Sequence, residues 1–184
     1  MSKNTIFSLL LFICALLIIV RVIPPSVDEN LALVLSKSRS NITNINHSRN
    51  ISDTRTVMID KVELNQDNRF KHPVLGVLGW TEDFYADIES RFRVTEKGRY
   101  RFMVGSDDGF SLKIDNKRLC QYPKDRPFSK QSCYRLLDVG EHTLTLSYFQ
   151  GFGNSGLTLE AGLANGAKPK FWGEDISGIE YIVE

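Results

Sequence analysis

Two adjacent carboxylates, Asp107 and Asp108, lie in the segment GSDDGF, directly after the alternating run GRYRFMV. An Asp-Gly step between two hydrophobic runs is a strong signal for a tight β-turn, because Asp tolerates the positive φ that such turns need. Paired carboxylates also supply the oxygen ligands that calcium prefers in proteins. The segment therefore predicts either a hairpin turn or a cation site, and the residue types alone leave both open.

Catalysis is not indicated by the remaining polar residues. The three histidines lie in unrelated segments, and there is no nucleophile motif. The paired acids are adjacent in the chain, whereas a glycosidase needs two carboxyl groups that face each other across a cleft. His142 is in phase with Leu144 and Leu146, so we expect a hydrogen-bonded structural histidine at the start of a strand. We predict that the chain is not an enzyme.

The segments around the carboxylate pair alternate between apolar and polar residues. In FYADIESRFRV, one face carries Phe84, Ala86, Ile88, Phe92 and Val94. The same period of two recurs in residues 100–104, 110–114, 144–148, 157–161 and 179–183. Short runs of this kind, bounded by Gly, Asn, Asp or Pro and without helical patterns between them, predict an all-β fold, an antiparallel β-sandwich or barrel.

Cys120 and Cys133 enclose a polar, proline-containing segment that has no nearby histidine and no C-x-x-C spacing. We predict a disulfide, which would stabilise the fold by about 3 kcal/mol. Two unrelated buried thiols are the alternative. Because disulfides persist in oxidising compartments, the pair predicts a domain outside the cytoplasm, either periplasmic or on the cell surface.

The N-terminus has a different character from the rest of the chain. Residues 6–20 carry no charge, and apolar residues continue to Ile23. A helix over this run would be about 27 Å long, which just spans the hydrocarbon core of a membrane. Small-x-small cleavage residues do not follow it. We predict a transmembrane helix over residues 1–25 that acts as a signal-anchor, with a cleaved signal peptide as the alternative.

Residues 26–55 separate this segment from the alternating region. VDENLALVLSK is compatible with a short helix, and the following SRSNITNINHSRNIS is too poor in apolar residues to pack. We predict a flexible Ser/Asn-rich linker over residues 26–55 and a domain over residues 56–184. The net charge of the chain is +1, and no cluster of Lys and Arg is interleaved with aromatics, so a nucleic-acid partner is excluded.

The order of the motifs resembles the PA-fourteen family, the domain first described in anthrax toxin protective antigen. The resemblance is carried by DFYADIESRFRVTEKGRYRFMVGSDDGFSLKIDNKRL and then LLDVGEHTLTLSYFQGFGNSGLTLEAGL, and it covers Val57 to Glu184. It implies a β-sandwich that is often appended to adhesins, glycosidases and toxins. In the yeast flocculin and epithelial-adhesin branch, this domain binds sugars through calcium.

The resemblance also implies a ligand set. In the sugar-binding branch a cis peptide joins the matching Asp pair, which lets both side chains reach one ion although successive side chains of a strand point to opposite faces. Gln150 falls where that branch uses an Asn side chain, and Phe152 and Asn154 fall where it uses backbone carbonyls. We therefore expect calcium at Asp107, Asp108, Gln150, Phe152 and Asn154, and sugar at Asp107, Asp108, Phe152 and Asn154. Gln is longer than Asn by one methylene, which displaces the amide by about an ångström.

Two functions follow from these observations. The first is a membrane-anchored carbohydrate-binding module of the lectin or adhesin type that depends on calcium. The second is a non-catalytic structural or assembly module of the cell envelope that binds a protein partner, in which the Asp pair only shapes a turn. Metal dependence discriminates between them. Trp80 and Trp172 are expected in the core or at its edge, with stacking on a sugar as the alternative.

Overall fold

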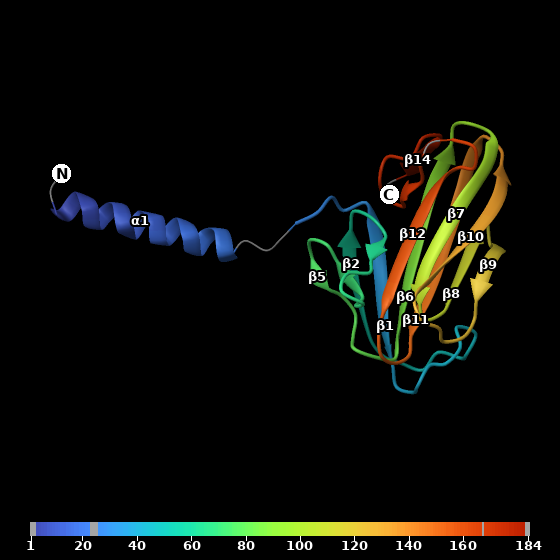
Figure 1. Cartoon of the computed structure of the whole chain (residues 1–184), viewed down its shortest axis with the longest axis horizontal. Helices are drawn as coiled ribbons and strands as arrows, with labels where there is room; N and C mark the ends of the chain where they lie inside the picture. The colour runs from blue at the N-terminus through green and yellow to red at the C-terminus, as the bar shows by residue number, and fades with distance from the viewer. Residues whose placement is uncertain (1–2, 23–25, 167, 183–184) are drawn as a thin grey trace.

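Two antiparallel sheets packed face to face form the main body of the protein (Figure 1). The computed structural model describes residues 3–22, 26–166 and 168–182. The strands of the larger sheet are β1 (Leu31–Ser38), β2 (Ile51–Ile59), β6 (Phe84–Val94), β8 (Phe110–Ile114), β9 (Lys117–Tyr122), β11 (Gly140–Gln150) and β14 (Ile179–Ile182). The strands of the smaller sheet are β3 (Glu63–Leu64), β7 (Gly98–Asp107), β10 (Ser129–Leu137), β12 (Gly156–Leu163) and β13 (Lys170–Phe171). A separate hairpin consists of β4 (Lys71–His72) and β5 (Gly76–Val77).

The order of the larger sheet is β2-β1-β6-β11-β8-β9, and β14 pairs with β6 beyond the end of β1. The order of the smaller sheet is β10-β7-β12-β13, and β3 also pairs with β12. Every pair of strands in both sheets is antiparallel. The predicted all-β sandwich is therefore confirmed.

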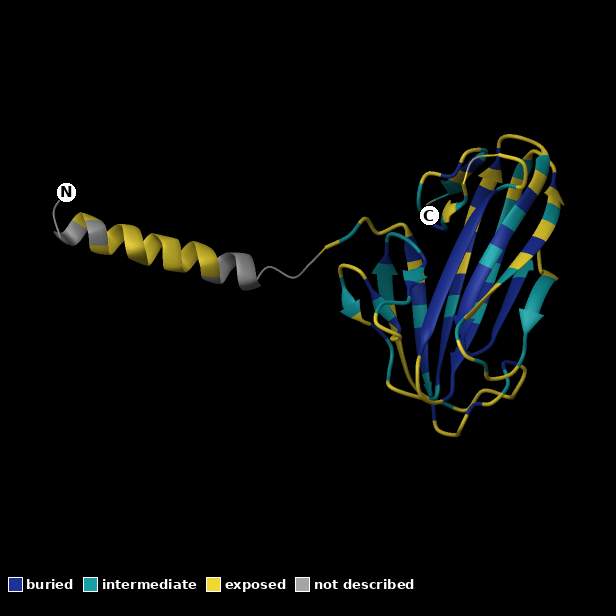
Figure 2. Cartoon of the chain, in the orientation of Figure 1, coloured by how far each residue is buried: buried dark blue, intermediate teal, exposed yellow. Residues whose placement is uncertain are grey.

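The alternating residues fill the space between the two sheets. All five side chains that the β6 pattern places inward are at most 1% exposed, and so are Tyr100, Phe102 and Val104 on the opposing strand β7. In Figure 2 much of the length of the long strands of the sandwich is coloured as buried, whereas exposed positions gather in the loops and in the helix. Burying one of these inward side chains contributes about 1.5–3 kcal/mol, so the layer that they form is the main source of stability.

The predicted linker over residues 26–55 is wrong, because this segment is part of the sandwich. Leu31, Leu33 and Leu35 of β1 are buried in the core, and β1 pairs with β2 on one side and with β6 on the other. The short helix expected in VDENLALVLSK is wrong for the same reason. The physical cause is that a short, nearly continuous apolar run fits a strand as well as a helix, and here the three leucines follow a period of two.

The loop between β1 and β2, residues 39–50, is also ordered by packing. Ile42 and Ile45 are buried with Tyr85 and Phe149 in a second, smaller core. The Ile42 N–H donates to Asp83 Oδ1 at 2.8 Å, which ties this loop to the segment before β6. Tyr85, which the alternation of β6 places on the outer face, is buried because this loop covers it.

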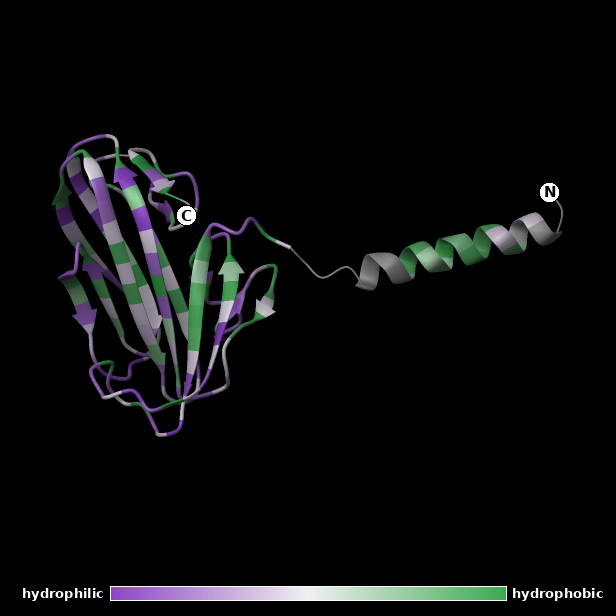
Figure 3. Cartoon of the chain, turned by 180° about the vertical axis from the view of Figure 1, so that it is seen from behind, coloured by the Kyte–Doolittle hydropathy of each residue, from purple (hydrophilic) through white to green (hydrophobic). Residues whose placement is uncertain are grey.

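The N-terminal segment forms helix α1 (Lys3–Val22). The apolar side chains whose exposure is described, such as Phe7 and Leu17, are exposed, and Figure 3 shows the hydrophobic character of the described part of the helix. Within residues 3–22, 26–166 and 168–182, however, no helix combines the length and the apolar character that crossing a membrane requires. The predicted transmembrane helix over residues 1–25 is therefore not supported, and residues 1–2 and 23–25 of this prediction lie outside the described residues.

A disulfide joins Cys120 to Cys133, as the sequence predicts. Cys120 lies on β9, the edge strand of the larger sheet, and Cys133 lies on β10, the edge strand of the smaller sheet. The bond therefore links the two sheets along one open side of the sandwich. It also closes the loop between β9 and β10.

Removing this bond is expected to lower the free energy of unfolding by about 3 kcal/mol, because the unfolded chain regains the freedom of the closed loop. The test is urea denaturation of the double variant Cys120→Ser/Cys133→Ser beside the oxidised wild-type protein. The matched control is Cys14→Ser, which removes an exposed free thiol and should leave the midpoint unchanged. Equal midpoints for the double variant and the wild type would contradict a stabilising role.

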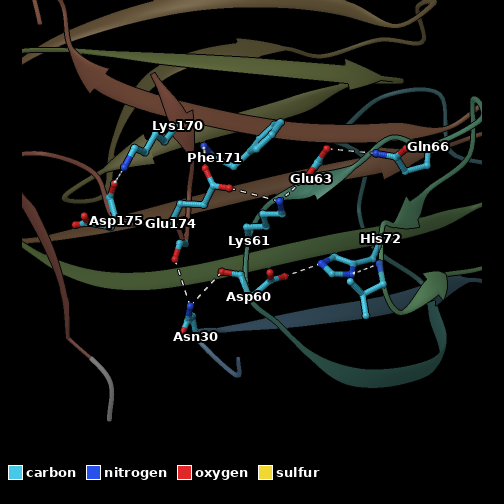
Figure 4. A network of polar contacts seen from close by, with 12 residues as sticks. Asn30, Asp60, Lys61, Glu63, Gln66, His72, Lys170, Phe171, Glu174 and Asp175 are labelled. Atoms are coloured by element: carbon cyan, nitrogen blue, oxygen red, sulfur yellow. Dashed lines mark hydrogen bonds and ion pairs between the residues drawn. The ribbon is translucent and has the colours of Figure 1, made fainter. Parts of the chain in front are cut away.

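A polar network fixes the turn between β2 and β3 to the C-terminal part of the chain (Figure 4). Asn30 Nδ2 donates to the Asp60 carbonyl at 3.3 Å, and Lys61 Nζ lies 3.4 Å from Glu174 Oε1. His72 is fully buried, and its Nε2 lies 2.7 Å from Asp60 Oδ1. Because Nδ1 of His72 accepts two backbone N–H groups from the β4–β5 turn, Nε2 carries the proton and donates to Asp60. The buried histidine is therefore a structural group.

Candidate functional site

The topology brings two loops that are far apart in sequence to one end of the sandwich. The chain crosses from the smaller to the larger sheet directly after Asp107, and the segment 151–155 crosses between the same sheets in the opposite sense. Asp107 pairs with Gly156 and Phe110 pairs with Tyr148, so both crossings lie at the same end. The structure thus places the Asp pair beside the loop in YFQGFGNSG, as the resemblance implies.

Three further loops reach this end because the strands that they join also end there. They are residues 39–50 between β1 and β2, residues 78–83 before β6, and residues 123–128 between β9 and β10. The loops gather at the lower end of the sandwich in Figure 1. The candidate site is therefore built from five connections, while the rigid sheets set where each connection begins.

A cis peptide bond joins Asp107 to Asp108, and backbone donors from two loops hold both carboxylates. Asp108 Oδ2 accepts a hydrogen bond from Gly151 N at 2.8 Å, and its Oδ1 accepts one from Arg126 N at 3.2 Å. Asp107 Oδ2 accepts one from Phe128 N at 3.0 Å. Asp107 is only 7% exposed and Asp108 only 4%. The cis bond implied by the resemblance is confirmed.

The electrostatics of the pair are unusual for surface loops. Burial raises the pKa of Asp108 to about 6 and raises the pKa of Asp107 as well, although the backbone N–H donors partly oppose this. Among the described residues, no Lys or Arg forms an ion pair with either carboxylate. The Arg126 guanidinium acts on Asp107 through space and partly lowers the pKa of this carboxylate, but it forms no ion pair with it, so a bound cation would add charge compensation by direct contact.

Gln150 is fully buried and its carboxamide is already hydrogen-bonded. Its Oε1 accepts from the Tyr148 hydroxyl at 2.6 Å, and its Nε2 donates to the Asn154 carbonyl at 2.9 Å. The same hydroxyl also contacts the carbonyl oxygen of Asp107. In this structure, Gln150 therefore ties β11 to the following loop, and its role as a metal ligand stays a prediction.

A cavity of 440 Å³ opens beside Asp108. Its other lining residues are Asn41, Ile42, Thr43, Glu82, Asp83, Asp125, Gly151 and Phe152. Four carboxylates in one cavity create a negative potential that attracts cations. The Phe152 side chain is 84% exposed at this cavity. Asn154 instead lines a separate cavity of 840 Å³ together with Trp80. The structure therefore brings Asp108 and Phe152 together and places Asn154 on a different surface.

The residues fit calcium in charge and in ligand type. Calcium takes about six to eight oxygen ligands, and carboxylates and carbonyls are its usual partners. The Asp pair supplies carboxylate oxygens, and Asp83 and Asp125 line the same cavity as Asp108. In the part of the chain that the structure describes, no three His, Cys, Asp or Glu side chains lie close enough to form a metal centre by themselves. The Asp pair would therefore need carbonyl or water oxygens to complete a calcium site.

Three of the other predicted residues have structural roles. His142 Nδ1 lies 2.8 Å from Asp115 Oδ2, so the predicted structural histidine is confirmed. Trp172 is fully buried in the core, which excludes it from sugar stacking. Trp80 is partly buried, and the Arg55 guanidinium lies 4.7 Å from the centre of its ring. The expectation that both tryptophans belong to the core or its edge is confirmed.

Several residues at the site escaped sequence reasoning. Asn41 and Thr43 come from the segment predicted as a linker, and Asp125 and Arg126 come from a polar loop inside the disulfide. Two of the three isoleucines in SRSNITNINHSRNIS, Ile42 and Ile45, are buried here, and they were the signal that this segment packs. Nothing in the local sequence indicates that these loops meet Asp108.

The fold and the site define a two-sheet β-sandwich with one acidic, loop-built cavity at its end. The chain belongs to the PA14 domain family, whose sequence profile matches residues 79–170. No curated protein matches the chain by sequence.

Solved structures share this fold at low sequence identity. The PA14 domain of the antifreeze protein MpAFP is 12% identical, with a TM-score of 0.60 over 80% of this chain and 89% of that one. The PA14 sugar-binding domain of an RTX adhesin is 13% identical, with a TM-score of 0.62 over 78% of this chain and 94% of that one. The A domain of Epithelial Adhesin 9 from Candida glabrata, solved with Galb1-4GlcNAc, is 11% identical, with a TM-score of 0.52 over 79% and 89% of the two chains.

Proposed function

We propose that this protein is a carbohydrate-binding module. In its binding site, Asp107 and Asp108 would hold a cation at the cavity beside Asp108, and the sugar would bind to this cation. The observation that carries the proposal is the pair of buried carboxylates, which are held by backbone N–H groups and form no ion pair with a Lys or Arg among the described residues. The structural likeness to a domain named as sugar-binding and to an adhesin domain solved with a disaccharide supports it.

The lining of the cavity suits a sugar. When bound, calcium would neutralise the two carboxylates and offer coordination positions to sugar hydroxyls. The Asn41 amide and the Thr43 hydroxyl line the same cavity and are able to hydrogen-bond further hydroxyls. The exposed ring of Phe152 offers an apolar surface for the C–H face of a sugar ring. A volume of 440 Å³ lies within the usual range for small-ligand sites, about 300–1,000 Å³.

We also propose that the domain works outside the cytoplasm. The Cys120–Cys133 disulfide supports this location, because such bonds persist in oxidising compartments. Anchoring by the N-terminal segment and the absence of catalysis remain predictions from the sequence.

The proposal is tested by thermal unfolding of the full chain with calcium and with chelator. Calcium at about 100 times its dissociation constant should stabilise the wild-type protein by about 2.7 kcal/mol. Asp108→Asn keeps the shape of the side chain but removes its charge, so this gain should vanish. The matched control is Asp53→Asn, which changes an exposed carboxylate on β2 and should behave as the wild type.

Sugar binding is tested on multivalent glycan surfaces. A single exposed sugar site is weak, with a dissociation constant near millimolar, or about −4 kcal/mol, and multivalency compensates for this. The wild type should bind in calcium and lose binding in chelator, and Asp108→Asn should not bind at all. Equal melting temperatures in calcium and chelator, together with a silent glycan surface, would refute the proposal. That result would favour the alternative, an envelope module that binds a protein partner.

A further inference from the structure

We propose that Arg126 is a positioning residue for the Asp pair. It lies in residues 121–132, the segment between Cys120 and Cys133 that includes the end of β9, the loop 123–128 and the start of β10, and that we call the tethered loop. Through this loop, Arg126 holds Asp107 and Asp108 in their binding geometry before any ligand arrives. The inference rests on the proposed function, because it concerns how the same two carboxylates are prepared.

Arg126 acts on Asp108 from two sides. Its backbone N–H donates to Asp108 Oδ1 at 3.2 Å. Its Nη2 donates to the Ser106 hydroxyl at 2.8 Å, and this hydroxyl donates in turn to the Asp108 carbonyl at 2.7 Å. The carboxylate and the backbone of Asp108 are therefore both fixed by contacts that lead back to one residue.

The guanidinium of Arg126 is itself held by aromatic rings and by its own loop. It lies 4.4 Å from the centre of the Tyr122 ring and 5.5 Å from that of Phe110. Its Nη2 also donates to the Ser129 carbonyl at 3.1 Å. Among its described contacts there is no ion pair with Asp107 or Asp108. Arg126 thus positions the carboxylates through hydrogen bonds and packing, while its charge acts on Asp107 only through space.

Phe128 gives the tethered loop a second point of attachment. Its backbone N–H donates to Asp107 Oδ2 at 3.0 Å. Its ring lies directly on Gly105, the first glycine of GSDDGF, because a Cβ there would come within 2.6 Å of the ring. Gly105 is therefore required for the close approach of the loop, and the loop reaches both carboxylates, one through Arg126 and one through Phe128.

The disulfide limits the freedom of the tethered loop at both of its ends. Cys120 and Cys133 lie on the edge strands of the two sheets, so the loop starts and ends on rigid elements. Groups that orient the ligands of a metal typically change its affinity by about 10–100-fold when they are removed. We expect an effect of this size from Arg126, although it touches neither metal nor sugar in the proposed site.

The test compares Arg126→Ala and Arg126→Lys with the matched control Arg118→Ala, all in the full chain. Arg118 is an exposed arginine on the neighbouring strand β9. Calorimetric titration with calcium alone should show that Arg126→Ala binds calcium at least about tenfold more weakly than the wild type, whereas Arg118→Ala should show no change. Arg126→Lys keeps the charge but loses the planar fork, so it should also bind more weakly if geometry is what matters.

A second readout needs no ligand. Hydrogen exchange of the backbone amides of Arg126 and Phe128 should be about tenfold faster in Arg126→Ala, because both donate to the Asp pair. Exchange of the core amide of Leu146 should not change, which shows that the variant is folded. If Arg126→Ala does not fold, Arg126→Lys serves for both measurements.

The outcomes separate this inference from the proposed function. If the wild type binds calcium and the Arg126 variants bind it equally well, Arg126 is not a positioning residue and the proposed function stands. If the wild type binds no calcium, the proposed calcium site is refuted, but hydrogen exchange still tests whether Arg126 positions the Asp pair. Unchanged exchange at Arg126 and Phe128 would then overturn the positioning role, whereas faster exchange confined to the tethered loop would support it.

Discussion

A chain that begins at residue 56 is expected to remain unfolded, whereas a chain that begins at residue 27 should fold and unfold cooperatively. The shorter chain lacks β1 and most of β2. Its β6 then has a free edge from Phe84 to Ile88, where β1 pairs in the intact protein. It also lacks the buried leucines of β1 and the two isoleucines that cover Tyr85.

The shorter chain is expected to remain unfolded because it loses a large part of the stabilisation that burial of apolar side chains provides. Each fully buried leucine or isoleucine contributes about 1.5–3 kcal/mol, and five are removed together. A typical domain is stable by only about 5–15 kcal/mol, so the loss is comparable to the total. Circular dichroism and urea denaturation of both fragments measure it. A cooperative transition of residues 56–184 at the midpoint of the longer fragment would contradict the place of β1 in the fold.

A single substitution also tests whether β1 belongs to the core, without removing the strand. Leu33→Ala in β1 should lower the free energy of unfolding of the full chain by about 2–5 kcal/mol, because it leaves a cavity in the core. The matched control is Ala32→Ser at the next position of the same strand, where the side chain is exposed. It should change the free energy of unfolding by less than about 0.5 kcal/mol.

These residues also show why part of the fold escaped prediction. The β6 pattern extends over the whole strand, Phe84–Val94, with charged residues on the outer face of its second half, so its period of two is unambiguous. In β1 the run LALVLSK carries leucine and alanine, which favour helices in isolation, and no charged residue marks its outer face before Lys37. Pairing with β2 and β6 decides its conformation, and local sequence does not contain that information.

The candidate site, like the fold, was predicted from the sequence only in part. The cis-linked pair and the loop beside it were predicted, because both belong to motifs that the resemblance covers. Asn41, Asp125 and Arg126 were not predicted, because their loops meet Asp108 only through the order of the strands. The partner of Gln150 was within reach of sequence reasoning, since Tyr148 is two residues earlier on the same strand and therefore on the same face.

The stability of the cation-free protein should fall as the pH rises from about 4 to about 6. Burial raises the pKa of Asp108 to about 6 from 3.8, so the folded state keeps this proton over a pH range where the unfolded chain has lost it. Protonation therefore favours the folded state, and its contribution is complete below pH 4 and lost above pH 6. The difference between the two pKa values corresponds to about 3 kcal/mol.

Calcium should reverse this trend. Protons and calcium compete for the Asp108 carboxylate, so the affinity for calcium should rise by about tenfold per pH unit up to pH 6 and then level off. Urea denaturation between pH 4.5 and 7.5, in chelator and in saturating calcium, measures both trends.

Asp108→Asn has no titrating group at this position and should lose the larger part of both trends, while Asp107, whose pKa burial also raises, keeps a residual slope. The control Asp53→Asn should keep both trends in full. The same pH profile in Asp108→Asn and in the wild type would show that another group is responsible. Opposite slopes in chelator and in calcium, both strongly reduced by this one substitution, would instead tie cation binding to the buried charge of Asp108. The reason is that only a group that is destabilising when ionised and free, and stabilising when ionised and bound, changes the sign of its contribution with calcium.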